Sequence, residues 1–158
     1  MMSFSELWKH FRLLSEPEGL PPDKAAFLEE FLRAEYARRE QKRIASLLRL
    51  SGIRRVKLLQ DFDWAFNPRI PREKIMEFMQ TDWLRRPANL VLIGPAGVGK
   101  SHLATAFCHD AILKGRQTVF AGLFDLTARL ARAKSLYTLI DYYARVPVLC
   151  LDELGYVI

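Results

Sequence analysis

The chain has 158 residues, of which half are apolar and 27% are charged, and its formal net charge is +6. This balance is typical of a soluble globular chain with a buried core, and it excludes bulk disorder and collagen-like sequence. No apolar run approaches the roughly 20 residues of a membrane-spanning helix, and the N-terminus lacks the uninterrupted apolar core of a signal peptide. We therefore expect a cytoplasmic protein.

The N-terminal part is expected to be helical. Ser3 and Glu6 have the spacing of a capping box for a first short helix. Residues 16–23 form a turn-rich break, and apolar residues then recur at three- and four-residue spacing over 24–50, which predicts a long helix. A Ser-Gly pair supplies its stop signal. The first helix is amphipathic, so it either packs on the long helix or offers an apolar face to a partner.

Positive charge is concentrated at the end of the long helix. Residues 38–57 carry eight basic groups against one acidic group, a net +7 that exceeds the excess of the whole chain. Such clustering is expected for a protein that binds a polyanion, whereas the alternative is a solvated helix face favoured by the helix dipole. Few aromatic residues interleave, so contact with the DNA backbone is favoured over base stacking. The candidate DNA-binding residues are Arg38, Arg39, Lys42, Arg43, Arg49, Arg54, Arg55 and Lys57.

Residues 58–72 hold two prolines and three aromatic residues, and we expect an irregular connector there, followed by a helix over 72–80. Phe62 and Trp64 in this connector either flank a nucleotide base or fill the joint between the two parts of the chain.

From residue 89 onward, short apolar runs alternate with helical segments. The expected strands are 89–94, 117–121 and 146–151, and the expected helices are 100–113, 123–133 and 136–144. This alternation predicts an α/β domain with a parallel sheet. Cys108 and Cys150 lie in apolar surroundings without a secretion signal, so buried reduced thiols are expected.

Residues 94–101 fit the Walker A pattern for a phosphate-binding loop between a strand and a helix. Glycines let the backbone turn tightly so that its N–H groups converge on phosphate, and the helix that follows adds the positive end of its dipole. The lysine can reach the β- and γ-phosphates, and the serine hydroxyl is a hard ligand for Mg²⁺. The predicted nucleotide-binding residues are Gly94, Pro95, Ala96, Gly97, Val98, Gly99, Lys100, Ser101 and His102.

An apolar strand that ends in Asp152 and Glu153 has the form of a Walker B motif. Asp152 is expected beside the phosphate loop, where it holds Mg²⁺, and Glu153 is expected to orient the attacking water as a general base. No Cys/His cluster has the spacing of a zinc site. One further strand candidate separates the two motifs, which by fold analogy favours AAA+ or RecA-like proteins over small GTPases and simple kinases.

Three stretches then carry a family resemblance. The sequence reads DFDW at 61–64, GPAGVGKSHLATAF at 94–107 and LCLDELGYV at 149–157. With the basic helix before them, these stretches resemble the IstB-like family of AAA+ ATPases, which is close to the DnaC-type replicative helicase loaders. The implied fold is a P-loop NTPase of the AAA+ type, with an incomplete parallel sheet preceded by a helical N-terminal segment.

The resemblance also implies a function. IstB-like proteins are ATP-dependent helpers of an insertion-sequence transposase that bind DNA with little sequence preference and oligomerise on it. For this chain the resemblance implies ATP at the phosphate loop, Mg²⁺ at Ser101 and Asp152, catalysis by Glu153 with Lys100, and DNA and a transposase as partners. It implies a homo-oligomer for the full-length protein.

Family members continue beyond the point that matches Ile158, so we expect an N-terminal fragment without the arginine that completes a neighbour's site. The expected organisation is a basic helical segment over 1–57, a connector over 58–88 and the first part of an ATPase core over 89–158. One alternative is a DnaC-like loader whose N-terminal helices grip a replicative helicase. The other is an ATP-binding remnant without turnover.

Overall fold

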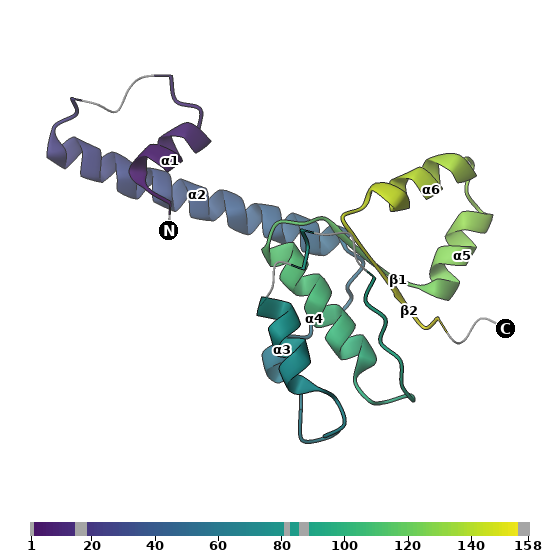
Figure 1. Cartoon of the computed structure of the whole chain (residues 1–158). Coiled ribbons are helices and arrows are strands. Elements are labelled where there is room, and N and C mark those ends of the chain that lie inside the picture. Colours follow the sequence, from purple (N-terminus) through teal and green to yellow (C-terminus); the bar gives the residue numbers. More distant parts are fainter. Residues whose placement is uncertain (1, 15–18, 81–82, 86–88, 155–158) are drawn as a thin grey trace. The chain divides into compact units, whose positions relative to one another are not determined.

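The computed structural model describes residues 2–14, 19–80, 83–85 and 89–154 (Figure 1). It contains helices α1 (Phe4–His10), α2 (Pro22–Leu50), α3 (Arg72–Gln80), α4 (Lys100–Leu113), α5 (Leu123–Ala131) and α6 (Leu136–Arg145), the short 3-10 helix η1 (Leu59–Asp61), and strands β1 (Thr118–Gly122) and β2 (Val148–Asp152). These elements confirm the predicted first helix, and they confirm the other predicted helices to within two residues at each end. The described part of the chain contains no helix long and apolar enough to cross a membrane.

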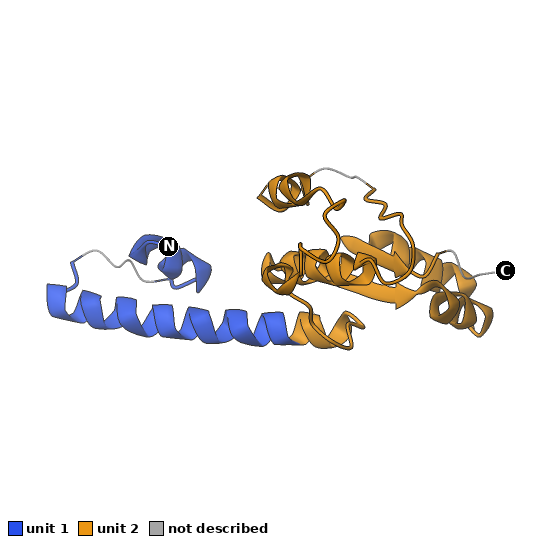
Figure 2. Cartoon of the chain, turned by 90° about the horizontal axis from the view of Figure 1, so that it is seen from below, with its two compact units in different colours: residues 1–45 blue, residues 46–158 orange. Residues whose placement is uncertain are grey.

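The chain divides into two compact units, residues 1–45 and residues 46–158 (Figure 2). Helix α2 contributes its first turns to unit 1 and its last residues to unit 2. The predicted division at residues 57 and 88 stays a prediction, and residues 81–82, 86–88 and 155–158 lie outside the described ones.

Unit 1 is built by packing α1 on α2. The capping box is present: the Ser3 side chain accepts from the Glu6 amide, and the Ser3 amide donates to the Glu6 carboxylate. Leu7 is buried, and the Arg39 guanidinium of α2 lies 4.7 Å from the Phe11 ring centroid. Of the two alternatives for the first helix, packing on the long helix is therefore the one that the structure shows.

Unit 2 is an α/β layer around helix α4. Strands β1 and β2 pair in parallel, with Phe120 opposite Cys150, and α4 packs against both strands. Half of the residues of α4 are buried, because a cluster of apolar side chains covers another part of the helix. The buried members of that cluster are Phe62, Leu103 and Phe107.

The predicted strand over 89–94 is not a strand in the structure. Its backbone makes no hydrogen bond with another backbone group within the described part of the chain. Leu90, Val91 and Ile93 are 50%, 64% and 92% exposed. A strand needs a paired neighbour, and the strands that pair within the described part of the chain are β1 and β2. The prediction of a strand at 89–94 is therefore wrong for this structure.

The free edge of β1 is occupied by the turn that follows α2. The Phe120 amide donates to the Ser51 carbonyl at 2.7 Å, and the Ser51 side chain is held by Leu48 O and by the Ile53 amide. Gly52 has a φ of +79°, and a Cβ there would lie 2.6 Å from Phe120 O. Only glycine fits this turn, because the backbones approach too closely for a side chain.

Candidate nucleotide-binding site

The loop over 94–101 has the backbone form that its glycines predict. Gly97 and Gly99 have φ values of +80° and +95°, in the left-handed region. Gly99 is the N-cap of α4, and Lys100 is its first residue. The Lys100 ammonium donates to the carbonyls of Gly94 and Pro95 at 2.9 and 2.6 Å. The loop therefore wraps around its own cation at a helix N-terminus, which is the arrangement that binds anions.

The connector packs directly on the loop. A Cβ on Gly99 would lie 2.6 Å from Cε2 of Phe62, whose side chain is buried. The His102 ring contacts Phe62 edge-on, and its Nε2 donates to Leu58 O at 2.8 Å. His102 thus ties the first turn of α4 to the connector. The buried ring of Phe62 therefore packs on the start of α4 within unit 2.

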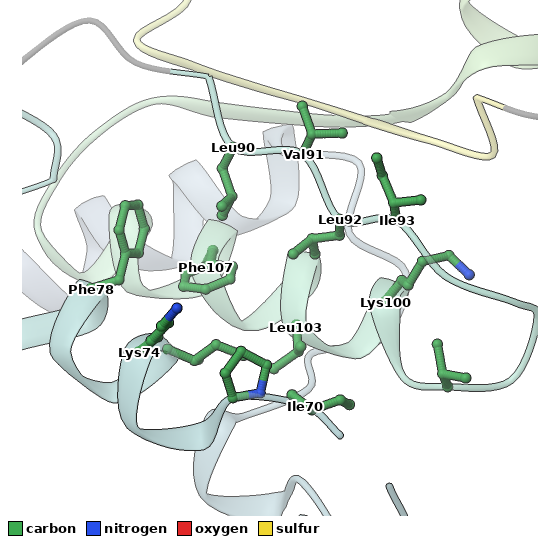
Figure 3. Close-up of a pocket in the computed structure, with 13 residues that line it drawn as sticks. Ile70, Lys74, Phe78, Leu90, Val91, Leu92, Ile93, Lys100, Leu103 and Phe107 are labelled. Atoms are coloured by element: carbon green, nitrogen blue, oxygen red, sulfur yellow. The ribbon is translucent and has the colours of Figure 1, made fainter. Parts of the chain in front are cut away.

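An apolar cavity of about 360 Å³ adjoins the loop (Figure 3). The figure shows Leu90 and Leu92 pointing toward α4, whereas Val91 and Ile93 point away from it. Helix α3 closes another side of this cavity. The remaining lining residues near the loop are Val98, Lys100, Leu103 and Phe107. The phosphate loop and an apolar space beside it thus lie within one unit.

Asp152 is the last residue of β2, and α4 packs on this strand. Glu153 has a φ of +64°, an uncommon conformation for a residue other than glycine, and its amide donates to Asp152 Oδ1 at 2.9 Å. A Cβ on Gly122 would lie 3.5 Å from Glu153 Oε2, so the Glu153 carboxylate lies at the end of β1. No hydrogen bond or ion pair joins these two acids to Lys100 or Ser101 among the described residues. The loop over 94–101 precedes α4 and the two acids end β2, so the packing of α4 against β2 connects the Walker A and Walker B segments.

The two cysteines also lie on these elements. Cys108 of α4 is buried, Cys150 of β2 is partly exposed, and both are free thiols. Interaction with Cys150 raises the pKa of Cys108, with burial as the second cause, and interaction with Cys108 lowers the pKa of Cys150.

The basic residues of 38–57 differ in whether they form an ion pair with an acidic side chain. In unit 1, Arg39 bonds to Glu35 at 2.7 Å and Arg43 bonds to Glu40 at 3.0 Å. The hydrogen bond from Arg39 lowers the pKa of Glu35. In unit 2, Arg54 lies 3.9 Å from Asp125 and remains 93% exposed. Those that form no ion pair with another described residue are Arg38, Lys42, Arg49, Arg55 and Lys57.

Two features of the site were not predicted from sequence. The serine and glycine at 51–52 signal a helix end, but nothing local indicates that they occupy the edge of β1. The link between His102 and Leu58 joins residues that are 44 positions apart. The position of His102 directly after Ser101 predicts that it lies near the loop, but it does not predict the bond to Leu58.

Comparison with known proteins agrees with these motifs. The insertion sequence IS232 protein of Bacillus thuringiensis subsp. berliner is 36% identical over 121 residues, covering 75% of this chain and 48% of that protein. The IS21 protein of Pseudomonas aeruginosa is 36% identical over 133 residues, covering 82% and 50%, and the IS5376 protein of Geobacillus stearothermophilus is 32% identical, covering 82% and 53%. The names of these relatives describe them as ATP-binding proteins of insertion sequences.

The chain spans about half the length of these curated relatives. The family described as IstB-like ATP-binding proteins matches residues 22–158, which is most of the chain. The α/β fold, with its phosphate loop and parallel strands, is that of a P-loop NTPase. The chain belongs to the family of IstB-like ATP-binding proteins.

Proposed function

We propose that this chain binds ATP at the loop over 94–101. The observation that carries the proposal is the loop itself: left-handed glycines at the N-terminus of α4 enclose the Lys100 ammonium. Phosphate oxygens accept hydrogen bonds from backbone N–H groups in such a loop, and the lysine side chain exchanges its carbonyl partners for phosphate. We further propose that His102 borders the site, since it directly follows Ser101 in the first turn of α4.

Two side chains carry oxygen atoms that suit Mg²⁺. The Ser101 hydroxyl at the start of α4 and the Asp152 carboxylate at the end of β2 are hard oxygen ligands. Mg²⁺, when bound, would neutralise charge on the β- and γ-phosphates. Glu153, whose carboxylate lies beside Gly122, is proposed to orient the water that attacks the terminal phosphate.

Replacement of the loop lysine tests the site. Lys100→Ala should abolish binding of a fluorescent ATP analogue in the presence of Mg²⁺, measured by anisotropy on the full chain. Lys114→Ala is the matched control, because Lys114 caps the other end of α4 and pairs with Asp110 at 2.7 Å. Normal affinity in Lys100→Ala, or equal loss in both variants, would refute the assignment.

The biological role is proposed from the relatives, whose names place them in insertion sequences. We propose that the chain is the ATP-binding part of a cytoplasmic transposition helper that activates a transposase on target DNA and assembles as a homo-oligomer. In this proposal residues 1–57 contact DNA or the transposase, residues 58–88 connect, and residues 89–158 begin the ATPase core. The apolar face of α2 at Phe27 and Phe31, which are 68% and 57% exposed, is compatible with such a contact.

Contact with DNA is proposed for the basic residues that form no ion pair with another described residue. Arg55 and Lys57 follow the Ser51–β1 anchor, so the backbone before them is fixed on the sheet edge of unit 2. Charges presented from a fixed backbone can contact phosphates without regard to base sequence. Arg38, Lys42 and Arg49 present further charge from α2.

Salt dependence tests this interface. The double replacement Arg55→Ala with Lys57→Ala should weaken binding to any DNA duplex and reduce the slope of log affinity against log salt by about 0.9 for each lost phosphate contact. Arg33→Ala is the control, because Arg33 forms an ion pair with Glu29. An unchanged slope in the double variant would exclude these two residues from the interface.

A further inference from the structure

His102 links the phosphate loop to the connector that precedes it in the chain. Its Nε2 donates to Leu58 O at 2.8 Å, and its ring meets the ring of Phe62 edge-on, with the two centroids 5.1 Å apart. The side chain of His102 is therefore engaged by the connector, although the residue directly follows Ser101 in the sequence.

The connector presents an ordered end to this histidine. Leu58 O also accepts from the Asp61 amide at 3.2 Å, in the turn that forms η1. Phe62 follows η1 and is 7% exposed, and a Cβ on Gly99 would approach its ring to 2.6 Å. One polar contact and one apolar contact therefore join the connector to the junction between the loop and α4.

The first turn of α4 needs an external contact of this kind. The first amide groups of a helix have no acceptor within the helix, and helix ends fray. The Leu103 amide donates to Gly99 O at 3.0 Å, which closes the turn but does not fix its position relative to other elements. The hydrogen bond from His102 fixes that position, because its acceptor, Leu58, lies outside the helix.

We propose that His102 is a positioning residue for the nucleotide site. Its hydrogen bond to Leu58 O holds the first turn of α4, and with it the Ser101 hydroxyl, in one position relative to the connector. His102 acts through the loop and Ser101 rather than through contact with the nucleotide. This role rests on the proposed binding of ATP at 94–101. Donors that are fixed before the ligand arrives lose less entropy when it binds.

Two substitutions separate the hydrogen-bond donor of His102 from its ring. His102→Phe keeps a ring against Phe62 and removes the donor, whereas His102→Gln keeps an N–H donor. Loss of one hydrogen bond should weaken binding of a fluorescent ATP analogue with Mg²⁺ about fivefold in His102→Phe, and His102→Gln should bind like the wild type. His109→Phe, on the same helix, is the control and should also bind like the wild type.

A double-mutant cycle with Ser101→Ala tests whether His102 acts through Ser101. The measured quantity is the ratio of the analogue affinity with Mg²⁺ to the affinity with EDTA. His102→Phe should lower this ratio in the wild-type background but not lower it further in Ser101→Ala, because both changes remove the same interaction. Equal lowering in both backgrounds, or an equal loss of affinity with Mg²⁺ and with EDTA, would overturn the proposal, since a merely structural role produces either result.

Native-state amide exchange supplies a measurement without nucleotide. The Leu103 amide should exchange faster in His102→Phe than in the wild type or His102→Gln, whereas the amides late in α4 should keep their rates. A chain that binds no ATP analogue but shows this difference would refute only the proposed function. Normal analogue binding in His102→Phe together with unchanged Leu103 exchange would refute only the role of His102.

His102→Asn provides a second test if His102→Phe unfolds, which fast exchange throughout α4 would reveal. The asparagine amide is too short to reach the position of Nε2, so the hydrogen bond to Leu58 O should be lost again. His102→Asn should then bind the analogue about fivefold more weakly than His102→Gln. Equal affinities of these two variants would overturn the proposal.

Discussion

The turn at Gly52 offers a sharp test of how the end of α2 is joined to the sheet. Gly52→Ala adds one methyl group to a residue with a φ of +79°, at a point 2.6 Å from Phe120 O. A left-handed backbone costs about 1 kcal/mol for a residue with a side chain. The clash is with backbone, so Ser51 and Phe120 must separate.

Separation breaks the hydrogen bond between the Phe120 amide and Ser51 O, which is 2.7 Å long. Ser51 is fully buried, and an unsatisfied buried polar group costs about 1–3 kcal/mol. We therefore expect Gly52→Ala to lower the free energy of unfolding by about 3 kcal/mol, near the upper end of ordinary single substitutions.

Gly97→Ala is the matched control, since Gly97 has a φ of +80° and no atom near its added Cβ. Gly97→Ala should lower the free energy of unfolding only by the cost of the left-handed backbone, which is about 1 kcal/mol. Urea unfolding measures both variants, and native-state exchange of the Phe120 amide reports the anchor locally, with faster exchange expected in Gly52→Ala alone. Equal destabilisation by the two substitutions, or an unchanged Phe120 exchange rate, would show that the close approach is not what requires glycine.

Three further predictions concern the site and unit 1. Gly99→Ala should weaken ATP binding more than Gly97→Ala, because its Cβ would meet the Phe62 ring at 2.6 Å, and equal affinities would refute this contact. Glu153→Gln should lower ATP hydrolysis about 10²-fold or more with little change in ATP affinity, and unchanged turnover would remove Glu153 as the base. The hydrogen bond from the Ser3 amide lowers the pKa of Glu6 below its ordinary 4.5, so the cap should stabilise α1 above that pH and fail as the pH falls. Exchange of the Ser3 amide should then accelerate on acidification, whereas a pH-independent protection factor would contradict the coupling.

Local patterns predicted most elements because their causes are local. The bounds of α3 and α4 equal the predicted 72–80 and 100–113, since apolar spacing and end signals determine where those helices begin and end. Membership of 89–94 in a sheet, by contrast, depends on which distant segments pair, and the local apolar pattern does not determine that pairing. For the same reason, the sequence did not predict that Ser51 lies at the edge of β1, because its partner Phe120 is 69 residues away.

The candidate site shows the same division between motif and context. The motif predicted the conformation of the loop, because left-handed glycines and a lysine at a helix start follow from the residue types themselves. It did not predict what holds the loop in place. Among the residues that the structure describes, the segment before the loop has no ladder hydrogen bonds, and the loop is supported by Phe62 against Gly99 and by His102 on Leu58. Side chains of the connector therefore pack on this loop and on the first turn of α4. Changes at 58–62 should alter nucleotide affinity even though they leave every motif residue in place.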